Sequence, residues 1–341
     1  MINIKVSLPS HGNGINFNNF IDSEDGSTKN IRFFINEDIQ SADGWLIFED
    51  LKFESEKCFV PKENIIYLNN ETSYKKNHFF EDHMVEFIKQ FKYTFGCYPQ
   101  KNESHTNTLP FLPWMVHANH GNSIYENTSL NYKHFANNEY LDKTFDLSVI
   151  CSNKKVTDNH ALRFEFLTTL KKHFNDRLVW FGNGVNQIER KIDVISKSRY
   201  HLVIENDSKY NLVSEKLFDA YLGNSFPIYY GANNIYEIFD KSSLKLIDIN
   251  DFEGSIKTIE NILSSNLYED NIESIYESKQ KVLNEYNFYT RINNIVKSHI
   301  QDIEKSSENI TLHSTQYFWK NTVSKKKQFK KALRRNLRLD L

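Results

Sequence analysis

The residues most able to do chemistry follow one apolar run in the second half of the chain. Tyr200–Ile204 is apolar and partly β-branched, which is typical of a buried strand. Glu205 and Asn206 end that run with side chains that can hydrogen-bond a ligand, and Ser214 is a good N-cap for a following helix. A polar loop between the carboxyl end of a strand and a helix N-terminus is where α/β proteins bind anions. The sequence therefore predicts an anion site here.

The first turn of this predicted helix holds Glu215 and Lys216. A lysine is unusual at that place, because the helix dipole already makes the N-terminus positive. Glu215 alone can supply the negative partner, as a local ion pair on a solvated face. Alternatively, Lys216 and the free backbone N–H groups share a phosphate group of a ligand. The residues themselves leave both interpretations open.

The whole segment resembles the donor-binding motif of glycosyltransferase family 10, the α-1,3/4-fucosyltransferases. The pieces of the motif recur in order over about thirty residues, which is far more specific than a lone glycine triplet. They are Ile204–Asn206, Leu212–Lys216, Asp219–Tyr221 and Pro227–Gly231. Leu212 departs from the family pattern, which has a tyrosine there. The change removes a hydroxyl that could contact the nucleotide sugar.

Two elements upstream also resemble the donor site of this family. Arg163 lies on a predicted helix after Ser152–Asn153, as in the family's S-N…R element, whose arginine would contact the donor's phosphates. A surface ion pair with Glu165 or Asp158 is the other interpretation of Arg163. Asn183 lies in the glycine-rich turn Phe181–Asn186, which resembles the G-R-G-x-N turn of bacterial members. Glycines there let the backbone approach a ligand, although a plain tight turn would look the same.

The amino half has to supply the catalytic base. The predicted strand Ile65–Leu68 runs into a turn that contains Glu71. This resembles the family's strand and turn whose glutamate is thought to be the catalytic base, so we assign that role to Glu71. Glu37, which ends another predicted strand, is the competing residue and a candidate acceptor contact. By default, a glutamate at a strand end is a solvated loop residue.

An apolar, aromatic segment broken by two prolines, Leu109–His117, joins the two halves. It is too short and too interrupted to cross a membrane. We interpret it as a rigid segment at a domain cleft, where Trp114 and His117 are candidate contacts to the acceptor. No cluster of further Cys or His residues supports a metal site at His117.

Length and composition fit two α/β units. The chain has 341 residues, of which 39% are hydrophobic and 14% aromatic, enough for two units of about 150 residues each. Cys58, Cys97 and Cys151 are far apart and odd in number, which argues against a disulfide framework. No apolar run approaches the roughly 20 residues of a spanning helix, and no signal-peptide pattern opens the chain. We therefore expect a cytoplasmic protein.

Basic residues are concentrated at the end of the chain, although the net charge of the whole is −2. Residues 320–341 contain nine lysines and arginines and one acid, with an apolar residue at every fourth position from Phe329 to Leu341. This pattern predicts a basic amphipathic helix that can lie on an anionic membrane surface. Docking of the tail on the acidic body of the protein and a disordered tail are the alternatives. Nucleic acid is not expected as a partner, because no recognition fold accompanies the charge.

Strands and helices alternate from residue 146 to about residue 265, which predicts a doubly wound parallel sheet. Together with the resemblance, this predicts an α/β protein of the GT-B type, with two Rossmann-like domains facing a central cleft. We predict an acceptor-side domain over residues 1–145, a nucleotide-sugar-binding domain over residues 146–305 and a basic tail over residues 306–341.

The resemblance implies inverting transfer of fucose from GDP-fucose to a hydroxyl of a bacterial surface glycan, such as a lipopolysaccharide O-chain. Glu71 would be the general base, while Lys216 and Arg163 would stabilise the GDP leaving group. Since no convincing D-x-D pair follows a strand, we expect no metal and no cofactor. The predicted donor-binding residues are Arg163, Asn183, Glu205, Asn206, Ser214, Glu215 and Lys216. Another GDP-linked sugar, or a noncatalytic module that binds nucleotide or glycan, is the alternative.

Overall fold

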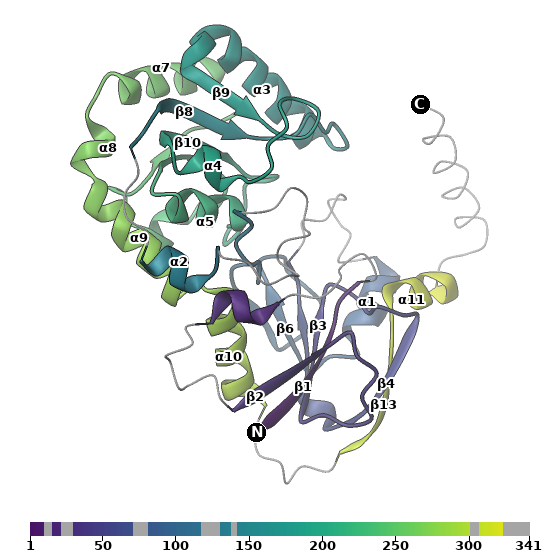
Figure 1. Ribbon diagram of the computed structural model, residues 1–341. Helices are drawn as coiled ribbons and strands as arrows, with labels where there is room; N and C mark the ends of the chain where they lie inside the picture. Colours follow the sequence, from purple (N-terminus) through teal and green to yellow (C-terminus); the bar gives the residue numbers. More distant parts are fainter. Residues whose placement is uncertain are drawn as a thin grey trace. The chain divides into compact units, whose positions relative to one another are not determined.

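The backbone of the chain divides into two compact units, each of which is treated by itself below. A computed structural model describes residues 1–9, 16–21, 30–70, 81–116, 130–137, 142–300 and 307–322 (Figure 1). Unit 1 comprises Met1–Gly14, Ser27–Thr108 and Ile295–Leu341, and unit 2 comprises Ile15–Gly26 and Leu109–Asn294.

Unit 1 is built on a six-stranded parallel sheet with the order β2-β1-β3-β5-β6-β7. The strands are β1 (Ile2–Ser7), β2 (Ile31–Ile35), β3 (Gly44–Phe48), β5 (Ile65–Leu68), β6 (Tyr93–Gly96) and β7 (His105–Asn107). Every residue of β3 and β5 is buried, as expected of central strands in a parallel sheet. The strand predicted over residues 65–68 is thereby confirmed.

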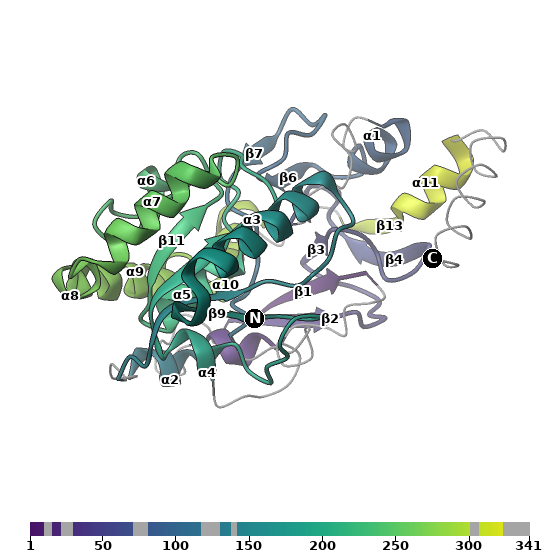
Figure 2. The same ribbon diagram turned by 90° about the horizontal axis from the view of Figure 1, so that it is seen from above.

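A second, two-stranded sheet in unit 1 joins distant parts of the chain. β4 (Ser55–Val60) pairs in antiparallel fashion with β13 (Glu308–His313). The remaining elements of this unit are the 3-10 turn Lys62–Asn64, α1 (Asp82–Ile88) and α11 (Thr315–Thr322), together with the end of α10 (Phe288–His299). α11 packs on α1 (Figure 2).

Unit 2 contains the doubly wound parallel sheet that the sequence predicts. The strand order is β12-β11-β10-β8-β9, and all neighbours are parallel. The strands are β8 (Phe145–Ile150), β9 (Leu178–Phe181), β10 (Ser198–Ile204), β11 (Phe226–Tyr230) and β12 (Lys245–Leu246). The α/β fold class with two parallel sheets is confirmed, while the cleft between domains stays a prediction.

Helices cover both faces of this sheet. α3 (Asp158–Phe174) and α7 (Phe252–Leu263) lie side by side on one face, and α4, α5 and α9 cover the other (Figures 1 and 2). The bounds of the helices on the second face are Ile192–Ile195 for α4, Glu215–Leu222 for α5 and Ile272–Asn284 for α9. Shorter elements are Phe17–Phe20 and Asn175–Arg177, both 3-10, and α2 (Tyr132–Ala136), α6 (Ile235–Ile238) and α8 (Leu267–Asp270).

The units differ from the predicted domains at three places, the first of which is the assignment of Ile15–Gly26 to unit 2. Residues 109–145 belong to unit 2, because the segment that begins at Leu109 is bonded to α4, α5 and α10. The chain returns to unit 1 at Ile295, within α10, because β13 pairs with β4. Contacts between residues so far apart in sequence leave no local signal that could mark either boundary.

The predicted amphipathic tail lies almost entirely outside the described residues, which end at Thr322. The expectation of a membrane-surface helix there stays a prediction. Among the helices that the structure describes, none combines the length and the apolar character needed to span a bilayer.

Candidate functional site

The loop that joins β10 to α5, residues 205–214, is organised by a buried carboxylate, and we call it the elbow loop. Glu205 is 1% exposed, and its Oε1 accepts the Ser214 backbone N–H at 2.8 Å. Its Oε2 accepts the Ser214 hydroxyl at 2.6 Å and the Lys216 ammonium at 3.3 Å. A buried charge is tolerated when it is paired and hydrogen-bonded in this way. Glu205 is thus placed to support Ser214 and Lys216, and not to face a ligand.

Ser214 is the N-cap of α5, as the sequence predicts. Its hydroxyl oxygen accepts the Lys216 backbone N–H at 3.3 Å and the Lys216 ammonium at 2.9 Å. With one donor and two acceptor positions in use, the hydroxyl is fully satisfied. The lysine is therefore fixed at the helix N-terminus from two sides, by Ser214 and by Glu205.

Lys216 and Glu215 are both charged at neutral pH. The Lys216 ammonium lies 3.3 Å from the Glu215 carboxylate. Burial alone would raise the pKa of Glu215, but the ammonium groups of Lys216 and Lys191 outweigh it and hold this pKa at about 2. Burial opposes the charge of Lys216, yet Glu205 and Glu215 raise its pKa above the ordinary value. The side chain of Lys216 is 27% exposed, so the ammonium stays within reach of a ligand.

Arg163 approaches the same loop from α3. It is 5% exposed, and its Nη1 donates to Asn206 Oδ1 at 2.5 Å and to the Ile204 carbonyl at 3.3 Å. The burial of Arg163 and these bonds contradict its interpretation as a surface arginine paired with Glu165 or Asp158. Within the described part of the chain, Nε of Arg163 is buried and has no hydrogen-bond partner. A buried donor without a partner is costly unless a ligand satisfies it.

Positive charge gathers around the elbow loop. The positive charge of Arg163 lowers the pKa of Lys216, which shows that the two cations repel each other. Burial, together with the charges of Arg163, Lys154 and Lys216, also lowers the pKa of His160. The sequence analysis missed Lys154 and His160, which carry no motif of their own. This electrostatic environment suits a phosphate group.

The glycine-rich turn after β9 lies on the end of the neighbouring strand β8. Gly182 and Gly184 have φ angles of 146° and 74°, which favour glycine, and a Cβ on either would clash with Cys151 or Asn153. Asn183 is exposed, and its carbonyl accepts the Asn153 backbone N–H at 3.1 Å. The turn therefore has to be glycine-rich to close on the loop after β8.

The sheet order brings the predicted donor-binding residues to one edge. β10, β8 and β9 are neighbours, and the residues follow the carboxyl ends of these parallel strands. Ligands of open α/β sheets bind at this edge. The loop after β11 closes the arrangement: a Cβ on Gly231 would clash with Glu205, and the Gly231 carbonyl accepts the Ser208 hydroxyl at 2.8 Å.

The candidates outside the elbow loop are placed less favourably. Trp114 is 1% exposed and packs edge-on against Phe20, with ring centroids 4.7 Å apart. The expectation that Trp114 offers a surface to the acceptor is therefore wrong; it belongs to the core of unit 2. Glu37 is exposed after β2, where its carbonyl accepts the Lys5 ammonium at 2.8 Å. Glu71 and His117 lie outside the described residues.

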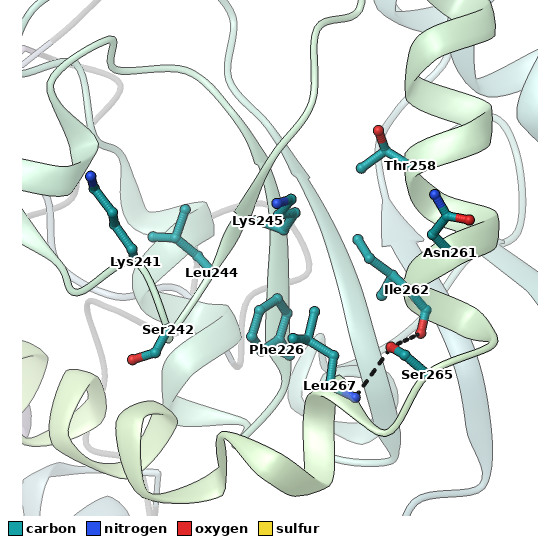
Figure 3. A pocket seen from close by; sticks show the side chains of 10 residues that line it. All are labelled: Phe226, Lys241, Ser242, Leu244, Lys245, Thr258, Asn261, Ile262, Ser265 and Leu267. Atoms are coloured by element: carbon teal, nitrogen blue, oxygen red, sulfur yellow. Dashed lines mark hydrogen bonds between the residues drawn. The ribbon is translucent and has the colours of Figure 1, made fainter.

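Other kinds of site that the described residues could contain are metal sites and pockets. Among the described side chains, no three His, Cys, Asp or Glu gather closely enough to hold a metal ion. A pocket of about 410 Å³ in unit 2 lies at the start of β11 and β12, the opposite end of the strands from the elbow loop (Figure 3). Phe226, Leu244 and Ile262 are among its lining residues, and none of the predicted site residues lines it.

Comparisons with known proteins identify the domain that carries the site. Residues 141–276 match the family model described as glycosyltransferase family 10 (fucosyltransferase) C-term. Alpha-(1,3)-fucosyltransferase FucT of Helicobacter pylori is 29% identical over 75 residues, which are 22% of this chain and 15% of that protein. The chain thus spans a small part of the length of this curated relative.

Similar solved structures share little sequence with the chain. An alpha1,3-fucosyltransferase crystallised with GDP-fucose is 16% identical, with 90% of this chain and 93% of that chain covered and a TM-score of 0.48. An alpha-glucosyltransferase in complex with UDP-glucose and DNA is 9% identical, with coverage of 87% and 100% and a TM-score of 0.48.

The match of the family model contains every predicted donor-binding residue, from Arg163 to Lys216. The resemblance read from the motifs of residues 204–231 is therefore confirmed for the domain in which those motifs lie. Residues 141–276 of this chain form a glycosyltransferase family 10 (fucosyltransferase) C-terminal domain.

Proposed function

We propose that the protein is an inverting glycosyltransferase that moves fucose from GDP-fucose to a hydroxyl of a bacterial surface glycan. The observation that carries the proposal is the convergence of Arg163 and Lys216 on the elbow loop, inside the region that matches family 10. The curated relative from H. pylori is an α-1,3-fucosyltransferase, which supports fucose as the donor sugar.

The chemistry proposed for the elbow loop is electrostatic. As the bond between sugar and phosphate breaks, negative charge accumulates on the β-phosphate of GDP. Lys216 is already fixed by Ser214 and Glu205, so it can meet that charge without reorganisation, which is what makes such groups effective. The unpartnered Nε of Arg163 supplies a further donor. These cations take the part that a divalent metal plays in other glycosyl transfers.

Other donor-site residues orient the substrate in this proposal. Asn206 is held by Arg163, and Glu215 by Lys216, so both side chains have fixed positions next to the cations. Asn183 is exposed at the same edge of the sheet. Glu71 takes the proton from the acceptor hydroxyl as its oxygen attacks the anomeric carbon.

The nucleotide class can be tested directly by thermal unfolding. We expect GDP and GDP-fucose, at about a hundred times their Kd, to raise Tm by about 5 °C, since a ligand that binds the native state alone stabilises it by mass action. EDTA should leave this shift unchanged, because Lys216 and Arg163 bind the phosphates. Stabilisation by UDP that requires Mn²⁺ would contradict the proposal.

A different GDP-linked sugar is the second candidate for the donor. Leu212, in place of the family's tyrosine, motivates it. A leucine has no hydroxyl to offer a sugar, and this side chain is also buried, at 2% exposed. Comparing initial rates with GDP-fucose and GDP-mannose decides between the two donors. A noncatalytic module would bind GDP but transfer neither sugar.

The proposed acceptor is a lipid-linked glycan, reached from the inner face of the cytoplasmic membrane through the basic tail. Truncation after Thr322 removes residues 323–341, with eight of the nine basic residues, but keeps α11 and its packing on α1. We expect the full chain, and not the truncated chain, to float with anionic vesicles, because each basic residue near the lipid contributes about 1 kcal/mol. Equal flotation of the two proteins would rule out anchoring by this segment.

A further inference from the structure

A buried ion pair lies one helical turn beyond the proposed donor contacts. The Asp219 carboxylate is 2% exposed and lies 3.0 Å from the Lys191 ammonium, at the N-terminal end of α4. The other oxygen of Asp219 accepts the Met115 backbone N–H at 2.8 Å. Burial raises the pKa of Asp219, while the Lys191 ammonium and the Met115 N–H oppose this shift.

Asp219 and Glu215 lie on the same face of α5. They are four residues apart, and side chains at that spacing are neighbours on a helix. Lys191 faces both carboxylates: it bonds Asp219 directly, and its charge is one of the two that lower the pKa of Glu215. Glu215 has Lys216 as its own partner at 3.3 Å. On this face of α5, Lys191 therefore pairs with Asp219, and Glu215 pairs with Lys216.

The same ion pair links the segment Leu109–Val116 to α5, the helix that carries Glu215 and Lys216. Met115 is held by Asp219, and the next residue, Val116, accepts the Ile192 backbone N–H of α4 at 2.8 Å. At its other end, the segment is held by Arg291, which donates to the Leu109 carbonyl at 2.5 Å. α4, α5 and this segment thus meet at Asp219.

We propose that Asp219 is a positioning residue that keeps Lys191 away from Glu215 and so leaves Glu215 with Lys216 at the donor site. The inference deepens the proposed function and rests on it, since Glu215 is taken to contact the nucleotide sugar. Without the charge of Asp219, Lys191 turns to the nearest remaining carboxylate on that face of α5, which is Glu215. Glu215 is then drawn from its position beside Lys216, and the donor binds less tightly.

The variant Asp219→Asn tests this with the smallest change of shape. Asparagine keeps a carbonyl oxygen for the Met115 N–H but no longer pairs with Lys191. We expect about a tenfold rise in the Kd of GDP and in the KM of GDP-fucose, the size of a typical coupling between neighbouring charges. The kcat at saturating donor should change much less, because Lys216 stays in place.

The double variant Asp219→Asn with Lys191→Met separates positioning from a structural role. If Lys191 acts on Glu215 through its charge, removing that charge restores the affinity for GDP to within about twofold of wild type. A merely structural role predicts the opposite, namely that the double variant binds GDP no better than the single one. Should Asp219→Asn fail to fold, the double variant alone decides: a Kd for GDP within about twofold of wild type supports the inference, and a Kd about tenfold higher overturns it.

The matched control is Arg190→Met. Arg190 is the residue next to Lys191, and its exposed side chain pairs with Asp193 of α4. We expect an unchanged Kd for GDP. If wild type binds GDP and Asp219→Asn binds it equally well, the inference fails while the proposed function stands.

If wild type binds no GDP, the proposed function fails first, and a crystal structure of Asp219→Asn decides the inference without a ligand. We expect the Lys191 ammonium within hydrogen-bond distance of the Glu215 carboxylate in that variant. An unchanged position of Lys191 there would overturn the positioning role.

Discussion

Replacing Lys216 with alanine is expected to lower the kcat for sugar transfer by about a hundredfold to a thousandfold. This is the loss seen when one preorganised group that stabilises transition-state charge is removed. Lys216 is preorganised in that sense, because Ser214 and Glu205 hold its ammonium group before any ligand arrives. The kcat and KM of GDP-fucose should be measured separately, since a group that acts on the leaving phosphate affects kcat in addition to binding.

Stability has to be measured beside activity in this variant. Glu205 stays buried in Lys216→Ala and keeps its bonds to Ser214, so we expect a loss of about 1–3 kcal/mol in the free energy of unfolding. Lys209→Ala is the matched control, because Lys209 lies in the same loop and pairs with Asp207. A Lys216→Ala protein that is folded and transfers sugar at the rate of the control would remove Lys216 from the mechanism.

Local signals in the sequence predicted the donor site well. The N-cap at Ser214, the buried strand Tyr200–Ile204 and the glycine turn after β9 depend on neighbours in the chain, and the structure has all three. What the sequence could not predict is the role of Glu205. Its burial depends on the loop after β11, where only the small Gly231 lets the backbone close over the carboxylate. Lys216 therefore has two carboxylate partners, and sequence analysis named only Glu215.

Contacts between distant residues explain the predictions that failed. Trp114 lies in an apolar segment whose composition fits either a surface for a ligand or a core. Phe20 buries it, from more than ninety positions earlier in the chain. In the same way, β13 pairs with β4, which lies far away in the sequence. The chain therefore returns to unit 1 at Ile295, before the predicted end of the second domain at residue 305. Neither contact leaves a periodic or local pattern.

Replacing Glu71 with glutamine is expected to lower sugar transfer by about a hundredfold to ten-thousandfold, the contribution of a general base. Glutamine keeps the size of the side chain but cannot accept the proton of the acceptor hydroxyl. The affinity for GDP should not change, because in this proposal Glu71 acts on the acceptor hydroxyl, while Lys216 and Arg163 bind the phosphates of GDP. Single-turnover rates of transfer and the Kd of GDP, measured on the same preparation, check both expectations.

Glu37→Gln tests the competing base, and Glu63→Gln, on the 3-10 turn before β5, is the matched control. Loss of transfer in Glu37→Gln with normal transfer in Glu71→Gln would move the base to the end of β2. If all three variants bind GDP and none loses transfer relative to wild type, neither glutamate is the base. If wild type itself binds GDP and transfers no sugar, the domain of family 10 is present without its catalysis. Only a loss of transfer confined to Glu71→Gln supports the full mechanism. In that mechanism Lys216 and Arg163 stabilise the charge of the departing phosphate, and the Glu71 carboxylate deprotonates the attacking hydroxyl.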